Sequence, residues 1–269
     1  PMLSVFNKTA MYVDQCFRGD TNIYTINGVK KIEKIQNGEI VLTKDGSFHK
    51  VLGIVKKYIN DDTYRIRTNN SIDTVYVTPN HNIYGLINMP SLPIYELRNY
   101  MNNNIDKLPK YLEVKDLTEF DYIGYPIPII EDELIYENDL CMFSGILLGN
   151  GYIENGYQYV EFYKDKGNDM KRFLLFFLNK NNIEYNSYNN KNNKIIKWLY
   201  VNRLKPIQKF LDLKYECLII FLEGLLKSNG CKINEKYNCM FYNVDESKKY
   251  LCYYIKYLFM RLGILVDGF

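Results

Sequence analysis

The sequence predicts a two-domain protein in which an all-β domain is followed by an α+β domain. The first observation is a series of short β-branched runs between residues 16 and 86, separated by Asn-Gly and Asp-Gly dipeptides. The second is a pair of apolar runs with small residues, CMFSGILLGNG and IIFLEGLLKSNG, each ending in Asn-Gly. The third is the alternation of strand-like and helix-like segments after each run. With 269 residues, the chain can form a hydrophobic core in each of two domains.

The first domain is expected to be a meander of short strands. Runs such as NIYTI, EIVLT and TVYVT have the β-branched and aromatic composition of strands. Between such runs, Asn27-Gly28, Asn37-Gly38 and Asp45-Gly46 supply the positive-φ residues that tight hairpin turns require. Prolines interrupt the sequence from residue 87 to about 138, which indicates a connecting segment rather than a long element.

Two short motifs in the β-rich region resemble the N-terminal splicing blocks of an intein. Cys16 opens the segment CFRGDTNIYT and corresponds to the first intein residue. Thr78 and His81, in VTPNH, correspond to the family's TxxH block. The segment INGVKKIEKIQNGEIVLTKDGS also resembles the Hint (hedgehog/intein) fold. That fold brings its start back beside the TxxH strand, which implies that Cys16 and His81 meet.

The chemistry implied by this resemblance is an N–S acyl shift at the Gln15–Cys16 bond. Turning a peptide bond into a thioester requires a thiolate nucleophile and protonation of the departing amide nitrogen. Cys16 would supply the thiolate, His81 the proton, and Thr78 a hydrogen bond near the same peptide. His49 is the only other histidine in the sequence, so the assignment of His81 has little competition. No cofactor is expected for this reaction.

Residues 1–15, PMLSVFNKTAMYVDQ, resemble a stretch of the large subunit of class I ribonucleotide reductase. The resemblance stops after Gln15, the residue before the intein-like motif begins. It implies that residues 1–15 are an extein and that the host protein is a ribonucleoside-diphosphate reductase. An ordinary amphipathic N-terminal helix is the alternative, because the spacing of Phe6, Met11 and Val13 also allows it.

The two apolar runs resemble a duplicated LAGLIDADG homing-endonuclease motif. In that family the two motif helices pack side by side through small residues, which here would be Ser144, Gly145 and Gly149 against Gly224 and Ser228. A hairpin around Asn155-Gly156, a helix and two more strands follow the first motif, which completes the family's αββαββα half. The second half is expected to be truncated. The implied partner is double-stranded DNA at the intein insertion site.

The nuclease site is expected to be degenerate. The acidic residues that family members use to hold divalent metal fall on Asn150 and Asn229, and two neutral amides remove the charge that attracts Mg²⁺. Lys205 lies where the family often has a basic residue near the cleavage site. Mg²⁺ is therefore expected only if the nuclease is active. The expected DNA-binding strands carry Tyr157, Tyr159, Lys191, Lys194, Lys197 and Trp198.

The resulting domain limits are an extein at 1–15, the N-terminal part of a Hint domain at 16–100, a connecting segment at 101–138, and an endonuclease domain at 139–269. No His-Asn pair before Ser, Thr or Cys closes the sequence, so the missing C-terminal portion of the intein is an expected partner. Two alternatives remain. One is a site-specific DNA-binding LAGLIDADG protein without catalysis, and the other is a free-standing hedgehog-type self-cleaving module.

Composition limits the remaining function classes. The sequence has no run of eighteen apolar residues and no signal-peptide pattern, which predicts a cytoplasmic protein without a membrane partner. Its six cysteines form no CxxC pair and, apart from Cys16, resemble small core residues. A net charge of +3 is too small to indicate nucleic-acid binding by itself.

Overall fold

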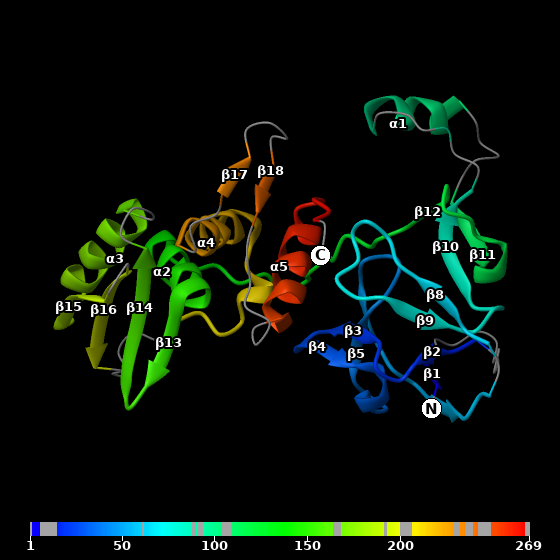
Figure 1. Ribbon diagram of the computed structural model, residues 1–269, viewed down its shortest axis with the longest axis horizontal. Helices are drawn as coiled ribbons and strands as arrows, with labels where there is room; N and C mark the ends of the chain where they lie inside the picture. The colour runs from blue at the N-terminus through cyan, green and yellow to red at the C-terminus, as the bar shows by residue number, and fades with distance from the viewer. Residues whose placement is uncertain are drawn as a thin grey trace. The chain divides into compact units, whose positions relative to one another are not determined.

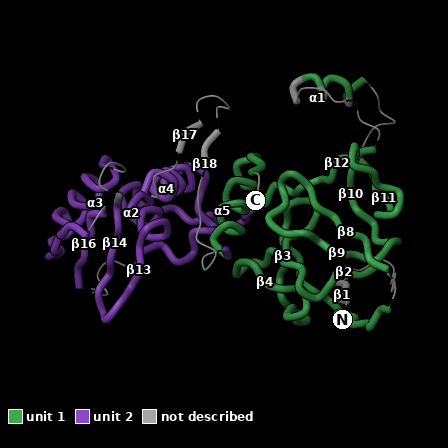
Figure 2. Tube along the Cα trace, in the orientation of Figure 1, with its two compact units in different colours: residues 1–129, 250–269 green, residues 130–249 purple. Residues whose placement is uncertain are grey.

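The computed structural model describes most of the chain as two compact units. The described residues are 2–5, 15–60, 62–87, 90, 94–103, 109–163, 168–190, 193–199, 206–228, 232–234, 239–241 and 249–266. One unit comprises Pro1–Ile129 with Tyr250–Phe269, and the other comprises Ile130–Lys249 (Figure 2). Each combines antiparallel strands with helices, so both units are mixed α/β structures.

Three antiparallel sheets form the first unit (Figure 1). A five-stranded sheet has the order β7-β1-β2-β9-β8, with β1 Met2–Val5, β2 Phe17–Arg18, β7 Ile54–Lys57, β8 Tyr64–Ile66 and β9 Val75–Val77. A four-stranded sheet has the order β4-β3-β5-β6, with β3 Asn22–Thr25, β4 Gly28–Lys31, β5 Ile40–Leu42 and β6 Phe48–Lys50. The third sheet has the order β11-β10-β12, with β10 Asn82–Leu86, β11 Lys110–Glu113 and β12 Tyr122–Ile123. Two 3-10 turns, η1 Ile32–Lys34 and η3 Val114–Asp116, join these strands.

The predicted positive-φ turns are confirmed in the first unit. Gly28, Gly38 and Gly46 have φ angles of +111°, +90° and +86°, the region that L residues rarely adopt. Gly46 is restricted further, because a Cβ at this position would lie 2.1 Å from the Ile127 carbonyl oxygen. Close approach and backbone conformation both require glycine there.

Helices within the first unit correct the expectation of an all-β domain. The helix α1, Ile94–Asn103, starts before residue 100, and α5, Lys249–Arg261, packs on strands of this unit. The Tyr257 ring of α5 lies 5.5 Å from the Tyr24 ring, and Tyr253 accepts a 2.6 Å hydrogen bond from the Asn22 amide. Burial raises the pKa of Tyr24. Contacts therefore group α5 with the β sheets, whereas the sequence-based limits include it in residues 139–269.

The second unit contains the predicted succession of helix, hairpin, helix and hairpin. Its first elements are α2 Asn138–Asn150, β13 Gly151–Glu154, β14 Tyr157–Tyr163, α3 Asn168–Lys180, β15 Tyr185–Asn190 and β16 Asn193–Leu199. They are followed by η4 Phe210–Asp212, α4 Tyr215–Ser228, β17 Lys232–Asn234 and β18 Cys239–Phe241. The final helix expected for the αββαββα half is missing from residues 206–214, where the structure has only the short η4 turn.

A four-stranded sheet with the order β13-β14-β16-β15 supports this unit. The β13–β14 hairpin turns at Asn155 and Gly156, whose φ angles of 48° and 76° confirm the predicted turn. One face of the sheet packs against α2 and α3, and residues such as Phe143, Leu174 and Trp198 form the core between them.

Close packing of α2 against α4 organises the rest of the unit. A Cβ on Gly145 would lie 2.0 Å from the Phe221 carbonyl oxygen, and one on Gly224 would lie 2.4 Å from the Met142 carbonyl oxygen. The Gly149 position likewise faces Ser228. The predicted helix pairing is therefore observed at the glycines and at Ser228, and the Ser144 hydroxyl accepts a 2.9 Å hydrogen bond from the Ile207 amide.

Candidate functional site

Backbone pairing places Cys16 beside the TxxH segment. Cys16 immediately precedes β2, and Phe17 in β2 pairs with Val77 in β9. The Cys16 amide nitrogen donates a 3.1 Å hydrogen bond to the Thr78 hydroxyl oxygen. In return, the Thr78 amide donates to the Cys16 carbonyl oxygen, also at 3.1 Å. Because the Cys16 nitrogen belongs to the Gln15–Cys16 peptide bond, Thr78 holds the atom that would have to leave in an acyl transfer.

His81 is fixed by a tight turn and by a second sheet. Its amide donates to the Thr78 carbonyl oxygen at 3.0 Å, which closes the turn from Thr78 to His81. The Val114 amide donates to the His81 carbonyl at 2.9 Å, and the Lys115 amide donates to the Pro79 carbonyl at 3.0 Å. The η3 turn therefore anchors the loop that carries the histidine.

The His81 imidazole is buried in a largely apolar environment. Only 8% of the residue is exposed, and the Phe17 ring packs edge-on against the imidazole with a centroid distance of 4.2 Å. Burial lowers the pKa of His81 to about 4, so the ring is neutral at neutral pH. Its Nδ1 atom is buried and has no hydrogen-bond partner among the described residues. A neutral ring with one uncommitted nitrogen is suited to exchange a proton with a reacting group.

The structure thus brings together the three residues that the sequence assigned to peptide-bond rearrangement. Cys16 is fully buried, and Gln15, on the other side of the scissile bond, is half-buried. Phe17 was missed as a site residue. No local signal in the sequence indicates it, because its ring contacts His81 from a distant segment of the chain.

Asn150 makes two side-chain hydrogen bonds that the sequence did not predict. It is the last residue of α2, and its Nδ2 atom donates hydrogen bonds to the carbonyl oxygens of Glu161, at 2.9 Å, and Ser228, at 2.5 Å. Those oxygens belong to β14 and to the last residue of α4. Asn150 therefore ties the two helices to the sheet. Asn229 and Lys205 lie outside the described residues.

The expected DNA-contacting residues do not share one face of the sheet. Tyr159 pairs with Lys197 across β14 and β16, so the two side chains lie on the same side, and Tyr157 is two residues from Tyr159. Trp198 corrects the expectation, because it is 4% exposed and belongs to the core. Lys194 is in register with the core residue Phe162 and so lies on the opposite side from Lys197. Lys191 is outside the described residues.

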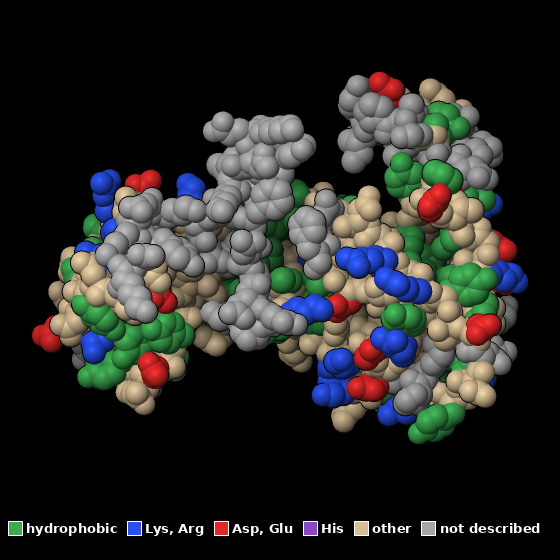
Figure 3. All heavy atoms as spheres, viewed as in Figure 1, with side chains coloured by type: hydrophobic (Ala, Val, Ile, Leu, Met, Phe, Trp, Pro, Cys, Tyr) green, Lys and Arg blue, Asp and Glu red, His purple; other side chains and the backbone are tan. Residues whose placement is uncertain are grey.

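The outer side of this sheet is aromatic and carries few charges. Tyr152 and Tyr159 stack with a centroid distance of 5.0 Å, and the Lys197 ammonium lies 5.1 Å from the Tyr157 ring centroid. Hydrophobic side chains gather over β13 and β14 in Figure 3. The register also places Glu161 on this side. Its surface is therefore better suited to stacking than to neutralising many phosphates.

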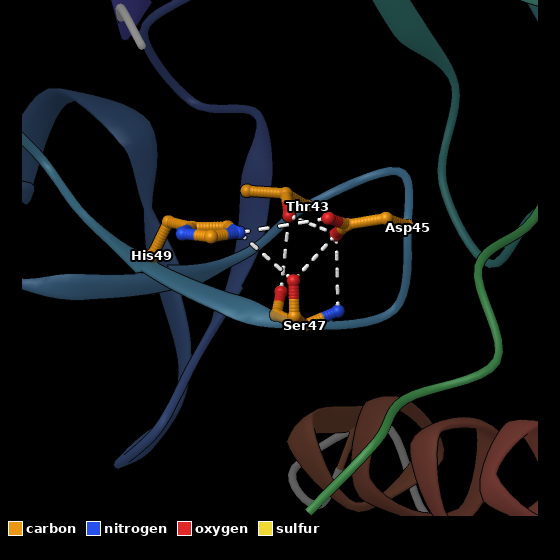
Figure 4. Close-up of polar contacts among 4 residues, drawn as sticks. All are labelled: Thr43, Asp45, Ser47 and His49. Atoms are coloured by element: carbon orange, nitrogen blue, oxygen red, sulfur yellow. Dashed lines mark hydrogen bonds and ion pairs between the residues drawn. The ribbon is translucent and has the colours of Figure 1, made fainter. Parts of the chain in front are cut away.

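A second cluster of polar residues lies at the β5–β6 hairpin (Figure 4). The Ser47 hydroxyl donates to Asp45 at 2.7 Å and lies 2.8 Å from His49 Nε2, and the Thr43 hydroxyl donates to Asp45 at 2.6 Å. These bonds hold the pKa of the Asp45 carboxyl well below its usual range. In a hydrolytic triad the histidine bridges serine and aspartate through different ring nitrogens. Here Ser47 and Asp45 both lie next to the same nitrogen, His49 Nε2. The cluster stabilises the turn at Gly46.

Metal and membrane features add no further site in the described parts of the chain. No group of three or more His, Cys, Asp or Glu residues there is arranged to hold a metal ion. None of the described helices is both long and apolar enough to cross a membrane.

Comparison with known proteins gives no family for the chain. No protein-family model matches it, and no curated protein does either. The geometry around Cys16 is therefore the basis for a functional proposal.

Proposed function

We propose that the first unit carries out an autocatalytic N–S acyl shift at the Gln15–Cys16 bond, as the splicing domain of an intein does. The observation that supports this proposal is the hydrogen bond from the Cys16 amide nitrogen to the Thr78 hydroxyl, with the neutral, buried His81 in the same turn. A nucleophile, a hydrogen-bond partner for the leaving nitrogen and a group that exchanges protons are the three parts that the proposed step requires.

The reaction is an isomerisation and needs no co-reactant. The Cys16 sulfur attacks the Gln15 carbonyl carbon, and a carbon–sulfur bond forms as the carbon–nitrogen bond breaks. The thiol proton ends on the departing nitrogen, which becomes the free amine of Cys16. His81, neutral because of its burial, accepts the thiol proton and delivers it to that nitrogen. Thr78 keeps the nitrogen in place throughout the step.

Cleavage by an external nucleophile tests the proposal on the intact chain. Hydroxylamine or dithiothreitol attacks a thioester but leaves a peptide bond unchanged, so residues 1–15 should be released, as detected by mass spectrometry under denaturing conditions. Cys16→Ala should abolish the release, whereas Cys252→Ala should leave it unchanged. Release from the Cys16→Ala chain at the original rate would refute the nucleophile.

The assisting residues can be tested with matched variants. His81→Ala should slow release by roughly 100-fold or more, the usual contribution of a positioned acid–base group. His49→Ala is the control, because His49 belongs to the exposed hairpin cluster. Thr78→Ala should slow release, and Thr78→Ser should largely restore it because the hydroxyl is retained. Equal rates for the two histidine variants would contradict the role of His81.

The proposed host is the large subunit of a ribonucleotide reductase, with residues 1–15 as its extein and the cytoplasm as the compartment. The resemblance of residues 1–15 to a stretch of that subunit supports this part of the proposal. Full splicing needs an asparagine cyclisation and a second nucleophile at a downstream junction, so the implied partner is a C-terminal intein portion. Adding such a portion in trans should give a ligated product, and Cys16→Ala should prevent it.

A degenerate LAGLIDADG domain that binds double-stranded DNA is proposed for the second unit. The close approach of α2 and α4 at Gly145 and Gly224 supports it. Cutting is not expected, because the Asn150 amide is committed to two backbone carbonyls and offers no negative charge to Mg²⁺. Binding to the uninterrupted reductase gene should weaken in the Tyr159→Ala variant. An unchanged affinity in a gel-shift salt series would contradict binding through this sheet.

A further inference from the structure

The segment upstream of Cys16 is part of the five-stranded sheet. The strand β1, Met2–Val5, lies between β7 and β2 in that sheet. All four of its residues pair with β7, from Met2 with Lys57 to Val5 with Ile54. Met2 and Leu3 also pair with β2, opposite Arg18 and Phe17. Residues that precede the scissile bond are thus bound on both sides by the unit that would cut it.

Backbone pairing of this kind binds an extended peptide largely independently of its side chains. Each residue of an inserted strand offers an N–H and a carbonyl to its neighbours, which is the mode of β-strand addition. The paired residues Met2 and Leu3 are not part of the bond to be cut, and the nitrogen of the Gln15–Cys16 peptide bonds to Thr78.

We propose that β7 and β2 form a strand-binding slot for the peptide upstream of Cys16, and that this slot retains that peptide after the Gln15–Cys16 bond has been cut. The backbone pairing is the evidence for the slot, whereas its role in retaining the product rests on the proposed acyl shift. Retention keeps the upstream segment beside the reaction site instead of allowing it to diffuse away. The slot binds an extended peptide that has a backbone N–H at the position of Leu3.

Hydrogen exchange on the intact chain tests the slot without any cleavage. Leu3→Pro removes the one amide hydrogen at a position that is paired on both sides, whereas Leu3→Ala keeps it. Because Cys16 bonds to Thr78 on its β9 side, the backbone groups of the next residue, Phe17, face Leu3. Exchange of the Phe17 amide should be roughly tenfold faster in the proline variant than in the alanine variant, because the ladder bond between Leu3 and Phe17 is lost. Tyr64–Ile66 in β8, which does not touch β1, should exchange equally in both. Equal exchange of the Phe17 amide in the two variants would overturn the slot.

Retention is tested in a chain that cannot cut itself. A site-specific protease sequence is inserted between Asp14 and Gln15 in the Cys16→Ala chain, and the cut product is run on a native size-exclusion column. In the chain with Leu3 unchanged and in the Leu3→Ala variant, the upstream peptide should co-elute with the rest of the protein. In the Leu3→Pro variant, the peptide should separate from it. Separation in all three, or co-elution in all three, refutes retention by the slot. Since Cys16 is absent, neither result depends on the acyl shift.

Discussion

Replacing Asn150 with aspartate should destabilise the second unit, even though aspartate is the residue that a metal-dependent nuclease would need there. The Asn150 amide group donates to the carbonyl oxygens of Glu161 and Ser228. A carboxylate of the same shape can donate neither hydrogen bond. It also places a negative charge against two carbonyl oxygens, whose partial charges are negative as well.

The magnitude follows from the two lost hydrogen bonds. Each contributes about 1 kcal/mol net, and an acceptor left without a donor raises the cost to about 1–3 kcal/mol. We expect Asn150→Asp to lower the free energy of unfolding by about 2–4 kcal/mol at neutral pH. Asn150→Ala loses the same bonds without adding charge, so its loss should be smaller. The unaltered chain, the alanine variant and the aspartate variant should rank in that order of stability.

Trp198 provides a probe of this unit alone. It is the only tryptophan of the chain and is 4% exposed in the core that contains Phe143 and Leu174. Its fluorescence during urea unfolding therefore reports on the second unit. The assay is repeated at low pH, where the introduced carboxyl takes up a proton and can donate one of the lost bonds. The difference between the aspartate variant and the unaltered chain should then narrow.

Two outcomes decide the interpretation of Asn150. Equal stability of the aspartate variant and the unaltered chain at neutral pH would refute the structural role of the amide. Recovery of stability on adding Mg²⁺ would indicate that the position still accepts a metal, because a divalent cation offsets the introduced charge. Without such recovery, restoring the acid at this position would not restore a nuclease.

Three further predictions concern other parts of the chain. Between about pH 6.5 and about pH 4, His81 is neutral in the folded chain but protonated in the unfolded chain. The free energy of unfolding should therefore fall by about 3 kcal/mol as the pH decreases through this range. His81→Gln should remove this pH dependence in urea unfolding followed by circular dichroism. Gly145→Ala should lower stability by about 3 kcal/mol or more by Trp198 fluorescence, since the new Cβ meets the Phe221 carbonyl, whereas Gly156→Asn should change it little. Asp45→Ala should lower the midpoint of urea unfolding through the lost turn hydrogen bonds, with hydroxylamine cleavage unaffected.

Local signals in the sequence were sufficient to predict the turns and the helix seam. An Asn-Gly or Asp-Gly dipeptide fixes a backbone conformation within two residues, and Gly28, Gly46 and Gly156 have the positive φ angles that it implies. The spacing of Gly145 and Gly149 similarly marks one side of one helix. Such features depend on neighbours in sequence, so they can be predicted before any tertiary contact is known.

Side-chain direction was also available in the sequence, although the prediction missed it. Lys197 and Trp198 are adjacent in a strand, and adjacent strand residues point to opposite faces. They could not both contact DNA on one face. Pairing of Tyr159 with Lys197 and burial of Trp198 follow that alternation. The partners of Asn150 could not be predicted in this way, because they come from a neighbouring strand and from the end of α4.

The position of α5 shows why an amphipathic pattern leaves its partner undetermined. Leu251, Ile255 and Leu258 recur at helical spacing and are buried, which a sequence can predict. The pattern states that one face of the helix must be covered but carries no information about the covering surface. That surface includes Tyr24 and Phe48, which lie more than two hundred residues earlier in the chain. The position of Cys16 beside Thr78 is equally independent of local propensity. A meeting of Cys16 with the VTPNH segment was predicted only because the sequence resembles a fold that brings these two segments together.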